Sequence, residues 1–144
     1  MAIVIDANRA GDFGRPLQYH ASIILNKVAS RHVRVAVGGK LLRELLGTGI
    51  RNLIVEWERS GRLVRAADAE VDAEELACAA LPIASDDPHV LALVRITGAR
   101  LVYTNDRPLM SDLKNVSICS PKGKVISTST DQKIVRRLLI TIGC

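Results

Sequence analysis

Aromatic side chains are scarce in this sequence. They make up 3% of its 144 residues, and the whole set is Trp57, Phe13, Tyr19 and Tyr103. Modules that bind single-stranded nucleic acid by stacking need exposed rings for successive bases, so this class of protein is poorly supported. The core must be aliphatic instead, and a hydrophobic content of 48% is sufficient for one domain of this length.

Cysteine is scarce as well. The three cysteines, Cys78, Cys119 and Cys144, are odd in number, form no Cys-x-x-Cys pair and have no histidine at the spacing of a metal site. A disulfide framework and a zinc site are therefore both disfavoured. We expect buried thiols in a reducing compartment.

The sequence also lacks long apolar runs. No stretch approaches the roughly 20 residues that cross a bilayer. The N-terminal MAIVIDANRAG has neither the basic start nor the long apolar segment of a secretion signal. We therefore expect a cytoplasmic protein with no membrane association.

Charge is the first positive signal. Twenty Lys and Arg against fifteen Asp and Glu give a formal net charge of +5 and a pI of about 9.4. Such a balance favours a polyanionic partner through long-range attraction. A soluble domain with a basic surface has the same composition, so charge alone does not decide between the two.

Short apolar runs alternate with helical patterns along the chain. Ala2–Ile5 is apolar without alternation, which is typical of a strand buried on both faces of a parallel sheet. Asp87 and Pro88 mark the start of a helix, and Gly98 marks its end. Further strands are predicted at residues 33–37, 62–66, 101–103, 116–119 and 125–126, and further helices at residues 16–30, 40–46, 50–59 and 72–80.

Strands that alternate with helices predict an α/β fold. We expect a single domain over residues 1–144, a three-layer sandwich in which helices flank a central parallel sheet of four to five short strands. After the polar break STSTDQ, the segment KIVRRLLITI is compatible with a terminal helix or with an added strand. Residues 127–144 are therefore a tail of uncertain role.

Four acidic residues stand where the predicted strands and helices begin or end. Asp6 directly follows the first strand, and Asp106 follows the strand at residues 101–103. Asp87 starts the helix that leads into that strand, and Glu44 lies on the flank of a short helix. Ligands of parallel α/β sheets bind at the carboxyl ends of the strands, so we expect these acids to meet there.

Carboxylates that meet in one place repel one another, and each raises the pKa of its neighbours unless a cation is present. Mg²⁺ or Mn²⁺ relieves this repulsion because hard cations prefer oxygen ligands. Bound there, such an ion polarises a phosphodiester and activates water. Asp112, six residues after Asp106, is placed to assist in an outer or second-metal role.

Each of these acids also has a purely structural interpretation. Asp87 before Pro88 is a good N-cap, in which case Asp86 is the functional acid. Asp106 is able to cap a helical turn in the same way, and Asp112 to be a solvated charge at its end. Glu44 alone is more often a surface residue. Asp6 is the hardest of the set to dismiss, because a charged residue straight after a buried apolar strand is costly unless it is exposed or paired.

Other candidate groups are weaker. His89, one turn into its helix, is able to reach a phosphate or a metal, but an imidazole on the helix surface is the simpler interpretation. Ser85, Ser111 and the cysteines have no visible base partner, so a covalent nucleophile is disfavoured. Gly38-Gly39-Lys40 lacks the full spacing of a phosphate-binding loop.

Taken together, several fragments resemble the PIN-domain family of metal-dependent ribonucleases. The fragments are IVIDAN with Asp6 and Asn8, GGKLLRELL with Glu44, SDDPHVLALVRITGARLVYTND with Asp87 and Asp106, and PLMSDL with Asp112. The resemblance covers residues 3–126. Of the adjacent pair Asp86 and Asp87, the second fits the family's distance to the next strand.

The resemblance implies a Mg²⁺- or Mn²⁺-dependent endonuclease acting on single-stranded RNA. It implies that the catalytic acids are Asp6, Glu44, Asp87 and Asp106, and that the metal ligands are Asp6, Asp87, Asp106 and Asp112. Hydrogen bonds from Asn8 and Thr104 would orient ligands or water. Basic side chains near the rim would hold the RNA backbone, namely Arg9, Arg107 and Arg15. An antitoxin protein and a homodimer are implied as partners.

Two other classes of function compete with this hypothesis. A nucleic-acid or protein-binding module would keep the acidic pocket without cleaving, and metal binding without turnover would indicate it. A receiver-type signalling domain would need a phosphorylatable Asp on a middle strand and a Lys on a late one, and neither is well placed here.

Overall fold

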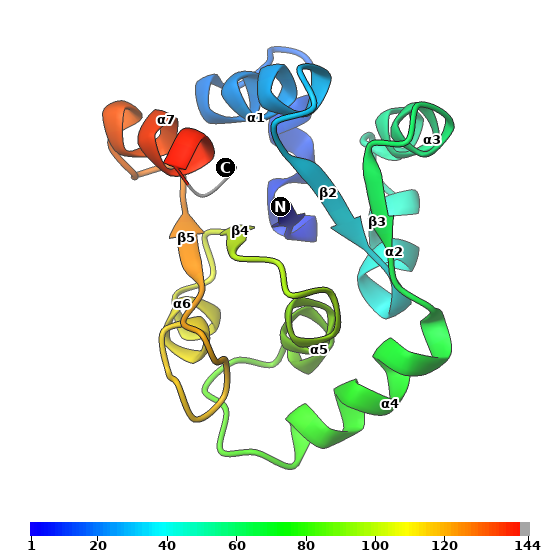
Figure 1. Cartoon of the computed structure of the whole chain (residues 1–144), viewed down its shortest axis with the longest axis vertical. Coiled ribbons are helices and arrows are strands. Elements are labelled where there is room, and N and C mark those ends of the chain that lie inside the picture. Colours follow the sequence, from blue (N-terminus) through cyan, green and yellow to red (C-terminus); the bar gives the residue numbers. More distant parts are fainter. Residues whose placement is uncertain (142–144) are drawn as a thin grey trace.

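The computed structural model describes residues 1–141, which form a three-layer α/β sandwich. Its central sheet has five parallel strands in the order β3-β2-β1-β4-β5 (Figure 1). The strands are β1 (Ala2–Ile5), β2 (Arg34–Val37), β3 (Leu63–Arg65), β4 (Leu101–Tyr103) and β5 (Lys124–Ile126). The predicted fold class is confirmed.

The strand order places a topological switch point between β1 and β4. The chain moves outward from β1 through β2 to β3, and then crosses to the other side of β1 to form β4 and β5. Connections on the two sides of such a point run over opposite faces of the sheet, which leaves a crevice at the carboxyl ends of the two central strands. Asp6 and Thr104 stand immediately beyond these two ends.

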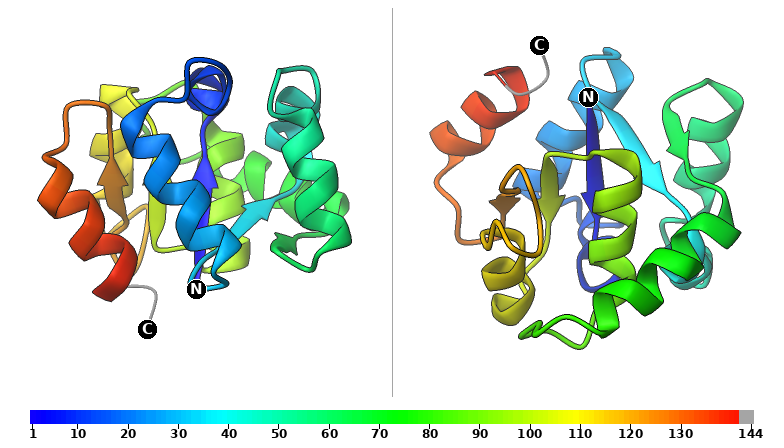
Figure 2. Two further views of the ribbon diagram at one scale, coloured as in Figure 1. Left: turned by 90° about the horizontal axis from the view of Figure 1, so that it is seen from above. Right: turned by 60° about the horizontal axis from the view of Figure 1, so that its bottom comes forward.

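Helices cover both faces of the sheet. In Figure 2, α1, α3 and α7 lie side by side over one face, and α4, α5 and α6 lie over the other. The helices are η1 (Ala7–Phe13, a 3₁₀ helix), α1 (Tyr19–Ala29), α2 (Gly39–Leu46), α3 (Arg51–Arg59), α4 (Asp68–Ala79), α5 (Pro88–Thr97), α6 (Arg107–Leu113) and α7 (Gln132–Thr141).

The helix ends follow local chemistry. The α5 helix has Pro88 in its first turn, and Gly98 follows its end in the left-handed conformation at φ 69°, both as predicted. Gly39, which starts α2, has φ +57°, and a Cβ there would lie 2.7 Å from Cγ1 of Val71. Only glycine fits this position, because backbone conformation and space both exclude a side chain.

Some predicted boundaries were wrong. The helix expected at residues 16–30 begins at Tyr19, and the helix expected at 72–80 begins at Asp68. The strand expected at residues 116–119 is a turn. There the Asn115 side chain accepts a hydrogen bond from Ser117 N at 3.0 Å, so local bonds replace a strand ladder. Ile118 and Cys119 are buried, so the apolar pattern of this segment reflects burial and not a strand.

The segment after β5 is part of the fold as far as residue 141. It forms α7, a helix as in one of the two alternatives, and α7 packs against α1 with Val135 and Leu139 buried. His20 Nε2 on α1 donates to the Thr130 carbonyl at 2.6 Å and anchors the loop that precedes α7. Residues 142–144, the end of the predicted tail, lie outside the described part of the chain.

Two further expectations concern membranes and thiols. None of the helices within residues 1–141 combines the length and the apolar character that a membrane span needs. Cys78 and Cys119 are buried free thiols, and Cys144 lies outside the described residues.

Candidate functional site

The site is built around Asp6, at the end of β1. Because β1 and β4 pair in parallel with Ile5 opposite Tyr103, the next residues, Asp6 and Thr104, are neighbours. Asp6 N donates to the Tyr103 carbonyl at 3.0 Å, and the Thr104 hydroxyl donates to Asp6 Oδ2 at 2.6 Å. Asp6 is only 6% exposed and Thr104 is fully buried. The carboxylate is therefore held in one orientation.

Asp106 is fixed by the same threonine. The Thr104 hydroxyl oxygen accepts from Asp106 N at 3.0 Å, so a single side chain connects two of the acids. Oδ1 of Asp106 accepts from Leu109 N at 3.1 Å and caps α6, as the structural interpretation of this residue predicted. Capping occupies only one oxygen, and the Asp106 side chain is close enough to that of Asp87 to raise the pKa of Asp87.

Asp87 enters the site from the start of α5. It stands at the N-cap position, but its side chain makes no capping hydrogen bond, so the cap interpretation is wrong for this side chain. Of the adjacent pair, Asp87 is the one whose charge interacts with Asp6, Asp106 and Glu44, whereas Asp86 is exposed.

Asp112 holds the loop that leads to Asp87. Its Oδ1 accepts from Ala84 N at 2.7 Å and its Oδ2 accepts from Ser85 N at 3.0 Å. At 2% exposed it is not the solvated charge considered above. Both oxygens are engaged by backbone amides, so the geometry favours a structural role over metal ligation.

Glu44 reaches the site from α2 with the help of a histidine. His89 Nε2 on α5 lies 2.6 Å from Glu44 Oε1. The Glu44 side chain is 39% exposed, whereas His89 is 3% exposed, so His89 does not lie on the helix surface as predicted. Its Nδ1 is buried and has no hydrogen-bond partner within residues 1–141. The contact with His89 thus positions Glu44, which is the most exposed of the four acids.

The acids act on one another electrostatically. Burial, then a hydrogen bond with Asp106, then the charges of Asp6, Asp106 and Glu44 raise the pKa of Asp87 to about 7. The pKa of Asp6 is also raised, chiefly by burial, although its hydrogen bond from Thr104 opposes the shift. Mutual repulsion and burial thus disfavour full ionisation of the cluster.

The predicted RNA-binding residues differ in their surroundings. Arg107 and Arg15 are exposed, as is Asn8. Arg9 is not free at the rim, because its Nη1 donates to Asp12 Oδ2 at 3.1 Å. The hydroxyl of Tyr103 donates to the same oxygen at 2.7 Å.

The sequence analysis favoured a surface position for His89, which was wrong, and it did not predict the clamp made by Asp112. A signal for His89 was present, because VLALV, directly after it, is apolar on every face of the helix. Such a helix is buried all round, and so is a histidine in its first turn. No local pattern indicates the Asp112 clamp, since its partners lie 27 and 28 residues earlier in the chain.

The geometry of the site and the chemistry of its side chains point in opposite directions on metal binding. Within residues 1–141, no group of three or more His, Cys, Asp and Glu side chains is arranged to hold a metal ion. The donor set still fits a hard cation, because Mg²⁺ keeps several waters and needs only one or two carboxylates from the protein. Carboxylates that raise one another's pKa are also what a cation stabilises.

Comparisons with models of protein families, with curated proteins and with solved structures gave no match to this chain. The candidate site therefore has to be interpreted from its own geometry and chemistry.

Proposed function

We propose that the protein is a PIN-type, metal-dependent endoribonuclease that hydrolyses phosphodiester bonds of single-stranded RNA at the acidic site. The observation that carries this proposal is the meeting of Asp6, Glu44, Asp87 and Asp106 beyond the carboxyl ends of β1 and β4. These are the four acids that the motif resemblance selected.

The four acids would have different roles in binding the ion. Asp6, Asp87 and Asp106 would ligate Mg²⁺ or Mn²⁺, with Glu44 beside them. When bound, the cation supplies a Lewis acid that neutralises phosphate charge and activates water for hydrolysis.

The surrounding residues keep this arrangement in place. Thr104 orients Asp6 and fixes the backbone of Asp106. His89 holds Glu44, and Asp112 holds the loop before Asp87 through its two amide bonds. Positioning residues of this kind commonly affect metal affinity and activity by about 10–100-fold.

The RNA would approach from the exposed rim. Arg107, at the first position of α6 next to Asp106, is exposed and is the best-placed cation to contact a phosphate. Asn8, exposed on η1, would contribute a hydrogen bond. Arg9 would act indirectly through Asp12 and Tyr103 rather than by direct contact.

The partner proteins implied by the resemblance stay predictions. A neighbouring reading frame that encodes a small DNA-binding protein would support an antitoxin. Sedimentation equilibrium would decide whether the chain forms a homodimer.

Cleavage of a mixed pool of single-stranded RNA tests the proposal. Wild-type protein should cleave with Mn²⁺ and not with EDTA, and Asp6→Asn should abolish cleavage. Asp86→Asn is the matched control, because it removes an exposed acid next to the site without touching the cluster. Cleavage that persists in Asp6→Asn would contradict the assignment. Mn²⁺ binding without turnover on any RNA would favour a non-catalytic binding module.

A further inference from the structure

A basic groove runs along the edge of the sheet between β5 and α7. Its cavity has a volume of about 440 Å³ and contains four cationic side chains, those of Lys114, Lys122, Lys124 and Arg137. Gly123, Val125, Ile134 and Leu138 complete the lining, so the groove has apolar walls and no acidic residue. Among the residues that the structure describes, none of its four cations forms an ion pair.

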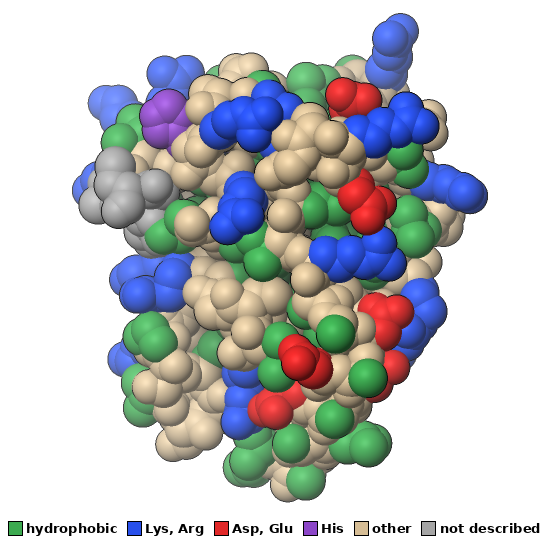
Figure 3. Space-filling view, turned by 45° about the vertical axis from the view of Figure 1, so that its right-hand side comes forward, with side chains coloured by type: hydrophobic (Ala, Val, Ile, Leu, Met, Phe, Trp, Pro, Cys, Tyr) green, Lys and Arg blue, Asp and Glu red, His purple; other side chains and the backbone are tan. Residues whose placement is uncertain are grey.

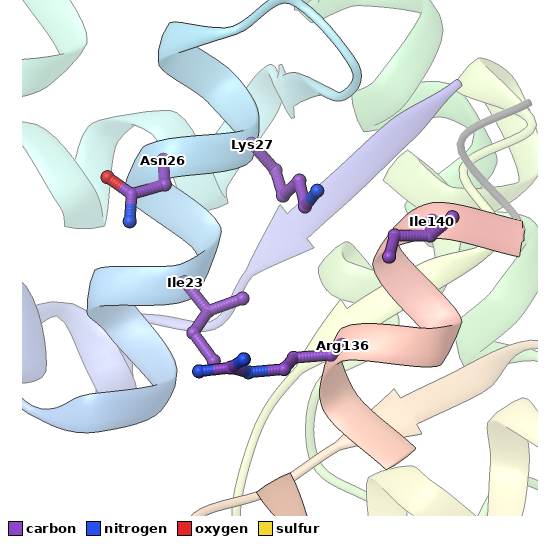
Figure 4. Close-up of a pocket in the computed structure, with 5 residues that line it drawn as sticks. All are labelled: Ile23, Asn26, Lys27, Arg136 and Ile140. Atoms are coloured by element: carbon purple, nitrogen blue, oxygen red, sulfur yellow. The ribbon is translucent and has the colours of Figure 1, made fainter. Parts of the chain in front are cut away.

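A second groove lies on the other side of α7, against α1. Its cavity of about 310 Å³ is lined by Ile23, Asn26, Lys27, Arg136 and Ile140 (Figure 4). The Arg136 guanidinium donates to the Tyr19 hydroxyl at 2.7 and 3.0 Å and lies 5.8 Å from the centre of that ring. This cation is therefore held in place at the surface.

The opposite edge of the molecule is organised differently. On the face shown in Figure 3, which brings the α3 and α4 side forward, acidic and basic side chains are interspersed. Ion pairs join neighbouring elements in this half of the chain, with Arg65–Glu58 at 2.8 Å between β3 and α3, Arg43–Asp72 at 3.5 Å between α2 and α4, and Arg95–Glu74 at 3.0 Å between α5 and α4. The groove between β5 and α7, by contrast, gathers four cations in one cavity.

We propose that this α7 basic surface binds the phosphate backbone of single-stranded RNA outside the acidic site. The surface consists of Lys27, Lys114, Lys122, Lys124, Arg136 and Arg137. Six cations in two grooves along one helix suit a linear polyanion, since several phosphates can be neutralised at once. Among the described residues, no aromatic side chain lines either groove, so contact is to the backbone rather than by base stacking.

The surface and the acidic site are close enough to share one strand of RNA. The α6 helix has Asp106 and Arg107 at its start and Lys114 just past its end, and a seven-residue helix spans roughly 10 Å. That the bound RNA is a substrate rests on the proposed function. Binding outside the reacting centre adds the same affinity to substrate and transition state, so loss of the surface should raise KM and leave kcat unchanged.

Fluorescence anisotropy with a labelled single-stranded RNA of about 20 nucleotides tests the inference, in EDTA so that binding is measured without cleavage. The variant Lys122→Gln/Lys124→Gln/Arg137→Gln removes three cations of the surface. The control Arg34→Gln/Arg51→Gln/Arg59→Gln removes three exposed cations elsewhere and has the same net charge. We expect about a 10-fold or greater rise in Kd for the first and less than about 2-fold for the control.

Salt dependence gives a second readout. Neutralising four to six phosphates of a single strand predicts a slope of about −3 to −4 for the logarithm of affinity against the logarithm of salt concentration. The surface variant should have a slope shallower by about 2, and the control variant should keep the wild-type slope.

Four outcomes would overturn the inference. The first is no RNA binding by the wild type, and the second is an equal rise in Kd in the two triple variants. The third is an unchanged Kd in the surface variant, and the fourth is displacement of RNA by poly-glutamate as effectively as by unlabelled RNA. The last would indicate an acidic protein as the ligand. If circular dichroism shows that the surface triple variant is unfolded, Lys122→Gln and Arg137→Gln are tested singly and each should raise Kd. RNA binding by a protein that never cleaves would refute the proposed function and leave this inference standing.

Discussion

The acidic site and the α7 basic surface differ in how the fold holds their charges. Asp6 is buried, Asp106 is tied to Thr104, and Asp87 is held beside both, so that its pKa rises to about 7. Five of the six cations of the α7 basic surface are exposed and Lys27 is half-buried, and four of the six share one cavity. Bringing the acids together costs free energy, because they lose hydration and repel one another. The cations stay hydrated, so their proximity costs little.

This difference predicts different consequences of substitution. A partly buried, repelling cluster persists only where the surrounding structure enforces it, and such arrangements concentrate at functional sites. Exposed cations contribute mainly to association. Changes in the acidic cluster should therefore alter chemistry, and changes in the basic surface should alter affinity.

The largest expected effect is that of removing charge from the centre of the cluster. Asp6→Asn should abolish metal-dependent cleavage, at least about 10³-fold in kcat, because the buried ligand is lost. The same change should raise thermal stability in EDTA, since a buried carboxylate with a raised pKa is replaced by a neutral amide. Single-turnover cleavage and thermal unfolding measure the two effects. A loss of both activity and stability would indicate misfolding instead.

Removing the clamp on the loop before Asp87 should cost stability as well as activity. Asp112→Ala leaves the amides of Ala84 and Ser85 without their charged acceptor, and we expect a loss of about 2–4 kcal/mol in the free energy of unfolding. Urea denaturation measures it. Glu56→Ala, which removes an exposed carboxylate on α3, is the control and should change the free energy by less than about 1 kcal/mol. Equal losses of unfolding free energy in the two variants would refute the role of Asp112 in holding this loop.

The raised pKa of Asp87 makes stability depend on pH in a definite direction. Because the folded state holds this proton up to about pH 7 and the unfolded state only to about 3.8, the stabilisation is complete below about pH 3.8 and is lost as pH rises through 7. In EDTA, raising the pH from about 5 to about 8 should therefore destabilise the wild type relative to Asp87→Asn.

Mn²⁺ should change that dependence. A cation competes with the proton for the carboxylate, so stabilisation by Mn²⁺ should grow between about pH 5 and about pH 8 in the wild type and be weak in Asp87→Asn. Thermal unfolding at the two pH values, with and without Mn²⁺, measures both effects. A pH dependence that is identical in the two proteins would show that Asp87 does not titrate in this range.

The smallest effect at the site should come from the residue that positions Glu44. His89→Ala removes the contact at 2.6 Å and should lower activity by about 10-fold. His89→Gln, whose amide is able to donate to Glu44, should recover most of it. Comparison of kcat and of Mn²⁺ affinity in the two variants separates positioning from a general loss of packing. Equal defects in both would point to packing.

The comparison also shows what could be predicted from the sequence. The α/β fold, the strands β1 and β4 and the capped helix α5 follow from local patterns, because buried parallel strands and helix ends leave strong signals. The approach of Asp6 and Asp106 was predictable for the same reason, since parallel strands bring their carboxyl ends to one edge.

Contacts between distant segments were not predictable. The apolar residues Ile118 and Cys119 gave a sequence pattern typical of a strand, but they are buried in a turn that the Asn115 side chain closes. The role of Asp112 depends on amides 27 and 28 residues away. The α7 basic surface draws its cations from four parts of the chain that only the packing of α7 brings together.

Binding of Mn²⁺ to the acidic cluster is the most direct test of the account. In a titration followed by electron paramagnetic resonance, the wild-type protein should remove free Mn²⁺ from solution at neutral pH, and Asp6→Asn/Asp106→Asn should not. The control Asp86→Asn should bind as the wild type does. Mn²⁺ binding that is equal in wild type and in Asp6→Asn/Asp106→Asn, or absent from both, would show that these carboxylates meet for another reason.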